Sequence, residues 1–159
     1  MDFETAFRLL IGHEGGYVND PVDRGGETKF GISRRAYPDL DIRGLSLDDA
    51  RAIYRRDYWD RLRLDEMPVP VRMAAFDFAV NSGVAAAARA LQSIAGVPAD
   101  GIVGPLTVAG VRRIDPAAIR FGLAAHRALI MLRLIARDRS QARFAAGWAN
   151  RLETEMDRR

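Results

Sequence analysis

The sequence contains no cysteine, a single lysine and only two histidines among its 159 residues. The absence of cysteine excludes disulfides and thiolate metal sites, and two histidines make a histidine-rich zinc site an unexpected feature. The absence of cysteine does not indicate the cellular compartment, because a protein without disulfides works in any redox environment. With Lys29 as the one lysine, arginine supplies nearly all of the positive charge.

Long hydrophobic runs are also missing. The most apolar stretch, residues 128–136, is interrupted by Arg133 and is too short to span a bilayer. The N-terminal segment MDFETAFRLL carries two acids and lacks the basic start and the long apolar region of a signal peptide. We therefore expect a protein that is made in the cytoplasm and has no membrane span.

The composition is that of an ordinary globular protein, with 48% hydrophobic and 28% charged residues. This length suits one domain with a sizeable core. The formal net charge of +3 and the pI of about 9.8 indicate attraction to a polyanion such as nucleic acid, anionic lipid or bacterial cell wall. Phe121 is the one aromatic residue among the arginines of residues 112–143, which is not the regular interleaving typical of nucleic-acid binding, so we expect no nucleic-acid partner.

Helical periodicity runs through most of the chain, and it predicts a mainly α fold with at most a small hairpin near residues 28–33. Caps, glycines and prolines mark the ends of the helices. The expected helices cover residues 3–14, 46 toward 59, 71–82, 85–95, a short segment from Pro105, 116–137, and a last segment carrying Phe144, Trp148 and Leu152. The helix at 71–82 is apolar on nearly all sides, which is typical of a buried central helix. The spacing of Phe144 and Trp148 predicts that these two rings pack in the core.

Glu14 is the first residue that a structural role alone explains poorly. Phe3, Phe7 and Leu10 recur on one face of the first expected helix, and Glu14 is the next position on that face. Burial and the negative end of a helix both favour the protonated carboxyl. A protonated acid in a cleft is what glycosidic bond cleavage needs in order to protonate the leaving oxygen. The alternative is that Glu14 ends a helix and points to solvent.

Glycosidic cleavage also calls for a second carboxylate that stays ionised. The polar loop after Glu14 offers Asp20, Asp23 and Glu27, and Asp23 lies in a glycine-flanked turn where backbone amides and water would keep it charged. The alternative is that these aspartates make turns.

Three segments resemble a known family. HEGGYVNDPVDRGGETKFGIS closely resembles the motif of glycoside hydrolase family 108, lysozymes of bacteria and phages with a lysozyme-like helical fold. FDFAVNSGVAAAARALQSIAGVPADGIVGPLTV resembles the peptidoglycan-binding region that accompanies the family, and FAAGWANRL fits its C-terminal pattern. Together the matches span most of the chain.

The resemblance implies that Glu14 is the general acid. The wider phage-type lysozymes place an Asp after eight intervening residues and a Thr after five more. Asp23 fits the first interval, whereas Thr28 follows after four residues and is one short. The implied catalytic set is thus Glu14, Asp23 and Thr28.

The resemblance implies a single lysozyme-like unit over residues 1–159, with a catalytic part at 1–90 and a peptidoglycan-binding-like helical part at 91–159. The expected reaction is hydrolysis of the β-1,4 bond between N-acetylmuramic acid and N-acetylglucosamine, by a monomer without a metal or organic cofactor. Two alternatives remain: a lytic transglycosylase of the same fold, and a non-catalytic wall-binding scaffold. An endolysin of this kind needs a holin or export machinery to reach peptidoglycan.

A few further residues are candidates for substrate contact. Tyr17 is close in sequence to the acid and would line a sugar cleft. Asp77 and Asn81 share a face of the buried helix, where they either point toward the cleft or make internal hydrogen bonds. The turn at residues 99–105 contacts the wall or is a bare structural turn.

Overall fold

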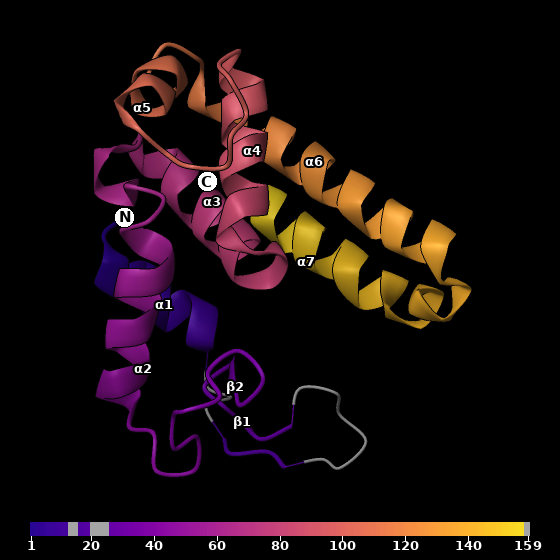
Figure 1. The fold of residues 1–159 in the computed structure, drawn as a ribbon. Coiled ribbons are helices and arrows are strands. Elements are labelled where there is room, and N and C mark those ends of the chain that lie inside the picture. Colours follow the sequence, from indigo (N-terminus) through magenta and orange to yellow (C-terminus); the bar gives the residue numbers. More distant parts are fainter. Residues whose placement is uncertain (13–15, 20–25, 158–159) are drawn as a thin grey trace. The chain divides into compact units, whose positions relative to one another are not determined.

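The computed structural model describes residues 1–12, 16–19 and 26–157. Its contacts divide the chain into two units. One is Asp2–Asp57, and the other consists of Tyr58–Arg159 together with Met1. Figure 1 draws the elements, which are helices apart from one short hairpin. The predicted fold class, a mainly α lysozyme-like fold with a small hairpin at residues 28–33, is confirmed.

In the Asp2–Asp57 unit, helix α1 (Phe3–Ile11) begins at Asp2, whose carboxylate accepts a hydrogen bond from the Thr5 amide at 2.8 Å. The helix ends at Gly12, which has a φ of +60°. The predicted continuation to residue 14 is therefore wrong, because the stop comes from Gly12 and not from the two later glycines. Glu14 itself lies outside the described residues.

The hairpin pairs β1 (Thr28–Lys29) with β2 (Ile32–Ser33). Its two turn residues, Phe30 and Gly31, both have positive φ, at 51° and 76°. This is the backbone of a two-residue turn whose twist matches that of the strands. A Cβ on Gly31 would lie 2.6 Å from the hydroxyl oxygen of Tyr54. Glycine at this position therefore allows the hairpin to approach α2 closely.

Helix α2 (Leu47–Tyr54) holds the hairpin against α1. It begins with a capping box in which Ser46 and Asp49 satisfy each other's backbone amides. At its other end Tyr54 packs on Phe7 of α1, with ring centroids 5.6 Å apart, and donates a hydrogen bond to the Phe30 carbonyl at 3.0 Å. A π-helical turn, η1 (Arg55–Trp59), follows directly.

The Tyr58–Arg159 unit is built around α3 (Val69–Ser82), which is buried along most of its length, as predicted. After the 3-10 turn η2 (Leu64–Glu66), α3 is followed by α4 (Val84–Ala95), α5 (Pro105–Val111), α6 (Pro116–Arg137), the 3-10 segment η3 (Arg139–Phe144) and α7 (Ala145–Asp157). α6 and α7 run side by side and are joined at one end by η3 (Figure 1).

One core prediction in this unit is wrong. Phe144 is 44% exposed and Trp148 is half-buried. Their rings contact each other, with centroids 6.1 Å apart, but they lie at the surface. Helical spacing showed that the two rings share a face and could not show whether another element covers that face.

None of the helices in the described part of the chain has the length and apolar character needed to cross a bilayer. Among the same residues, no group of three or more His, Asp or Glu side chains is arranged to hold a metal ion.

Candidate functional site

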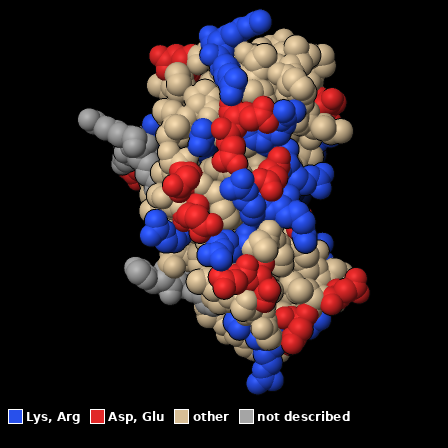
Figure 2. Space-filling model, turned by 90° about the vertical axis from the view of Figure 1, so that its left-hand side faces the viewer, with Lys and Arg blue, Asp and Glu red and all other residues tan. Residues whose placement is uncertain are grey.

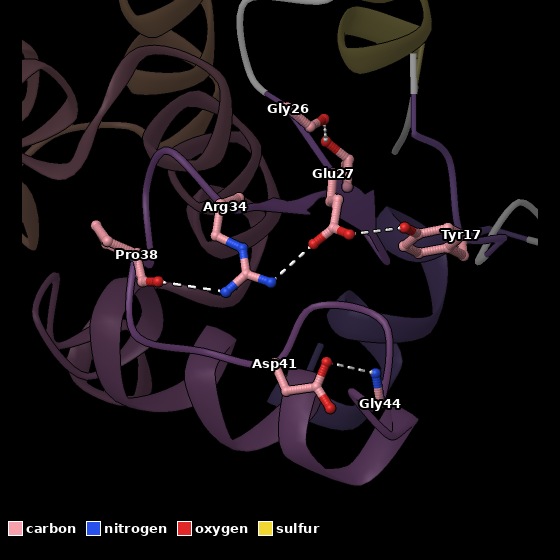
Figure 3. A network of polar contacts seen from close by, with 8 residues as sticks. Tyr17, Gly26, Glu27, Arg34, Pro38, Asp41 and Gly44 are labelled. Atoms are coloured by element: carbon pink, nitrogen blue, oxygen red, sulfur yellow. Dashed lines mark hydrogen bonds and ion pairs between the residues drawn. The ribbon is translucent and has the colours of Figure 1, made fainter. Parts of the chain in front are cut away.

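A network of polar side chains surrounds the carboxylate of Glu27, next to the hairpin (Figure 3). The Tyr17 hydroxyl donates to one oxygen of Glu27, and an Nη2 hydrogen of Arg34 is donated to the other, each at 2.8 Å. Arg34 also donates to the Pro38 carbonyl at 3.3 Å. The carboxylate is thus held between a phenol and a guanidinium.

Strand register explains why these side chains meet. Thr28 pairs with Ser33 in the hairpin, so Glu27 and Arg34 are the next residues facing each other across the strands. Their backbones are also joined, since the Arg34 amide donates to the Glu27 carbonyl at 2.8 Å. Opposite charges at directly opposed positions stabilise such a pair of strands.

An isolated bridge brings the segment that contains Tyr17 to the same place. The amides and carbonyls of Val18 and Thr28 exchange two hydrogen bonds of 2.8 Å. Thr28 is half-buried, and its hydroxyl donates to the Gly26 carbonyl at 3.4 Å. Two residues predicted for the site, Tyr17 and Thr28, therefore lie on neighbouring backbone segments.

The network keeps Glu27 ionised. Hydrogen bonds from Arg34 first and Tyr17 second hold the pKa of the Glu27 carboxyl below its usual range. The same contact with Glu27 raises the pKa of the Tyr17 phenol. The guanidinium of Arg43 lies 5.9 Å from the centre of the Tyr17 ring and packs on its face. Glu27 is therefore suited to be a fixed negative charge, and unsuited to donate a proton near neutral pH.

The sequence pointed to this cluster incompletely. The sequence offers Glu27 as one of three loop carboxylates and favours Asp23 among them, and Arg34 is not among the predicted site residues. A signal was present: Glu27 and Arg34 are equally distant from the turn Phe30-Gly31, so a two-residue hairpin must place them opposite each other.

Glu14 and Asp23 lie outside the described residues. Their catalytic roles stay predictions, and the described part of the site consists of Tyr17, Glu27, Thr28 and Arg34.

Asp77 and Asn81, the other two candidates, are on α3 in the Tyr58–Arg159 unit. Asp77 is 3% exposed, and its carboxylate accepts a hydrogen bond from Nη1 of the buried Arg127 at 2.7 Å. Asn81 donates its amide to the Asp77 carbonyl at 2.7 Å. These contacts correspond to internal hydrogen bonding, one of the two alternatives; substrate contact by Asp77 or Asn81 stays a prediction.

The turn at residues 99–105 is held to α4 by hydrogen bonds to the side chain of Gln92. The Gln92 amide donates to the Asp100 carboxylate at 2.6 Å and to the Ile102 carbonyl at 3.0 Å, and it accepts from the Gly101 amide at 2.9 Å. These bonds account for the turn as a structural feature. Ile102, in the same turn, is 73% exposed.

Charged side chains of both signs are interspersed on the face drawn in Figure 2. α6 differs from this pattern, because residues 116–137 contain arginines and a histidine and no acid. The excess positive charge of the chain is therefore partly concentrated on one helix.

Comparison with known proteins agrees with the fold. Residues 7–83 match the family model described as Glycosyl hydrolase 108, and residues 86–153 match the model described as Predicted Peptidoglycan domain. Among curated protein sequences there is no significant match.

A solved structure, that of SagA from Brucella abortus, is similar over nearly the whole chain. The two share 32% sequence identity with a TM-score of 0.83, and the match covers 98% of this chain and 92% of SagA. The chain therefore belongs to the glycosyl hydrolase 108 family, and it is a glycoside hydrolase that acts on peptidoglycan.

Proposed function

We propose that the enzyme is a muramidase that hydrolyses the β-1,4 bond between N-acetylmuramic acid and N-acetylglucosamine. Glu14 is the general acid, and Asp23 and Thr28 hold the attacking water. The observation that carries the proposal is the polar cluster at the hairpin, where Glu27, Thr28 and Tyr17 lie together; these residues follow Glu14 in the sequence within the range matched by the hydrolase family. Such a loop suits a reaction in which water and a developing positive charge must be stabilised.

Glu27 has a positioning role in this proposal. Its bonds to Tyr17 and Arg34 fix the two backbone segments that flank Thr28. Because its lowered pKa keeps Glu27 ionised near neutral pH, it also adds negative potential beside the sugar, where an oxocarbenium-like transition state carries positive charge.

The test of the acid is Glu14→Gln, which keeps the shape of the side chain and cannot donate a proton as an acid. We expect the folded variant to lose clearing of embedded cell wall in a zymogram by at least about 10²-fold, the usual contribution of a general acid. Clearing equal to the wild type by a folded Glu14→Gln protein would exclude this role.

Product analysis separates hydrolysis from the alternative, lytic transglycosylation. A transglycosylase uses the sugar's own 6-hydroxyl as nucleophile and yields 1,6-anhydro ends, which are one water lighter in mass spectrometry. We expect reducing N-acetylmuramic acid ends instead, since the loop supplies groups that hold water. If water attacks directly, the carboxyl groups of Glu14 and Asp23 lie about 6.5–9.5 Å apart and the anomeric configuration inverts.

For its place in the cell, we propose that the monomeric enzyme is made in the cytoplasm and acts on the wall as an endolysin, after a holin or an export system gives it access. Expression with and without a holin tests this, since lysis that needs no such partner would contradict it.

A further inference from the structure

A groove with a volume of about 470 Å³ opens in the Tyr58–Arg159 unit, between α6, η3, α7 and the C-terminal end of α3. We call it the α6–α7 groove. Residues of α6 and α7 supply much of its lining, and these two helices run side by side in Figure 1. Its volume lies within the range of small-ligand sites.

One part of the groove is apolar and aromatic. Ile130, Met131 and Leu134 of α6 face the rings of Phe144 and Trp148 across it. Both side chains are partly exposed; because the two rings contact each other and Arg143 packs on Phe144, only the exposed parts of the rings are open to a ligand. Flat, half-exposed rings beside small aliphatic groups suit the apolar face of a pyranose and the methyl of an N-acetyl group.

The rest of the groove is polar and positively charged. Asn81 lines it, and its bond to the Asp77 carbonyl fixes the amide, whose oxygen can accept a hydrogen bond from an acetamido N–H or a sugar hydroxyl. The exposed guanidinium of Arg143 lies 4.7 Å from the centre of the Phe144 ring. Among the described residues that line the groove, none is acidic. A carboxylate of the ligand is therefore attracted to the end where Arg143 lies.

From these features we propose that the α6–α7 groove is a second peptidoglycan site, separate from the hairpin, which takes an N-acetylated amino sugar together with a carboxylate of its stem peptide. The inference rests on the proposed function for the choice of polymer. Most of the lining residues fall within residues 86–153, which match the model described as Predicted Peptidoglycan domain. The groove, and not the turn at residues 99–105, is then the wall contact of this half of the chain.

Gly147 offers a direct test, because it lines the groove and a Cβ added there meets no atom within 4 Å. Gly147→Phe fills the groove without displacing the core. The matched control is Ala149→Phe, at an exposed position of the same helix that does not line the groove. Both are made in the Glu14→Gln protein so that the wall is not digested during the measurement.

Binding is measured by sedimentation with purified sacculi. We expect Gly147→Phe to raise the dissociation constant about fivefold or more, and Ala149→Phe to leave it unchanged. Equal binding by both variants would overturn the proposal. Melting curves verify that the variants are folded. If Gly147→Phe does not fold, a second pair of variants, at Arg143, tests the proposal.

That pair is Arg143→Gln and Arg143→Lys, assayed on intact sacculi and on sacculi whose stem-peptide carboxyls have been converted to amides with a carbodiimide and methylamine. We expect Arg143→Gln to weaken binding to intact sacculi only, and Arg143→Lys to restore much of it. An equal effect on both preparations, or none, would overturn the assignment of the carboxylate. Loss of binding to phosphatidylglycerol vesicles without any effect on sacculi would instead identify a membrane contact.

The release of reducing ends by the protein with Glu14 intact is measured in parallel. It tests the hydrolase mechanism alone, so a failure of the muramidase assignment and a failure of the groove assignment give different results.

Discussion

At Glu27, two hydrogen bonds decide the charge of a residue that the sequence showed only as one of several loop acids. Because Arg34 and Tyr17 hold the pKa of the Glu27 carboxyl down, the folded state favours the ionised form. Such a group stabilises the fold above the pKa of the unfolded chain, about 4.3 for Glu, and this contribution is lost as the pH falls through the lower folded pKa.

We therefore expect Glu27→Gln to lower the melting temperature at pH 7 and to have a smaller effect at an acidic pH below the lowered folded pKa, where the wild-type carboxylate is protonated too. Thermal melts of both proteins over this pH range measure the difference. Glu153→Gln, at an exposed position of α7, is the control and should change the melting temperature little at either pH. A Glu27→Gln effect that stays constant with pH would mean that charge is not the source of the stabilisation.

Arg127 and Asp77 show a different electrostatic situation, since both side chains are almost fully buried, at 1% and 4% exposure. Removing one partner deprives the other buried charge of this ion pair. We expect Asp77→Ala to lower the free energy of unfolding by about 3–5 kcal/mol, measured by urea denaturation.

The double variant Asp77→Leu/Arg127→Met is the matched comparison. It should recover most of the loss, because replacing both charges by apolar side chains of similar volume is often neutral. A double variant as unstable as Asp77→Ala would show that the pair contributes more than mutual compensation.

At the scale of elements, the hairpin depends on the contact between Gly31 and Tyr54. Gly31→Ala adds a positive-φ cost and a clash with the Tyr54 hydroxyl, whereas Gly96→Ala at the end of α4 adds the φ cost alone, since a Cβ there meets no atom within 4 Å. We expect Gly96→Ala to cost about 1–2 kcal/mol of unfolding free energy and Gly31→Ala to cost more.

Tyr54→Phe removes the clashing oxygen, and the next atom of the ring, Cζ, lies 3.9 Å from the added Cβ. In that background Gly31→Ala should cost no more than Gly96→Ala, which a double-mutant cycle measures. Activity should fall with Gly31→Ala in the wild-type background, because the hairpin carries Thr28 and Glu27. Equal costs in both backgrounds would exclude the close approach as the reason for glycine.

For the whole molecule, the net positive charge predicts that binding to the bacterial cell wall depends on salt concentration. With a pI of about 9.8 and an α6 free of acids, binding to anionic sacculi should weaken as salt rises. Exposed charges act over only about 10 Å at 0.1 M salt, so most of the loss should occur below that concentration. Sedimentation with sacculi over a salt series measures this, and constant binding would show that the basic charge does not contribute.

The fold class, the family and most helix boundaries could be predicted from local patterns in the sequence. Ser46 with Asp49, Pro105, and Asp115 with Pro116 are local signals, and the structure begins α2, α5 and α6 where they indicated. Such signals succeed because a cap or a first-turn proline acts on its own backbone within a few residues. The end of α1 shows the limit of this reasoning, since several glycines were available and Gly12, the first, ended the helix.

Tertiary structure alone decided which polar groups meet. Asp77 finds Arg127, fifty residues away, and Glu27 finds both Arg34 and Tyr17 because strand register and the Val18–Thr28 bridge bring three segments together. It also decided that Phe144 and Trp148 line an open groove. Helical spacing determines which residues share a face, whereas burial depends on whether another element covers that face, and no such element lies over these two rings among the described residues.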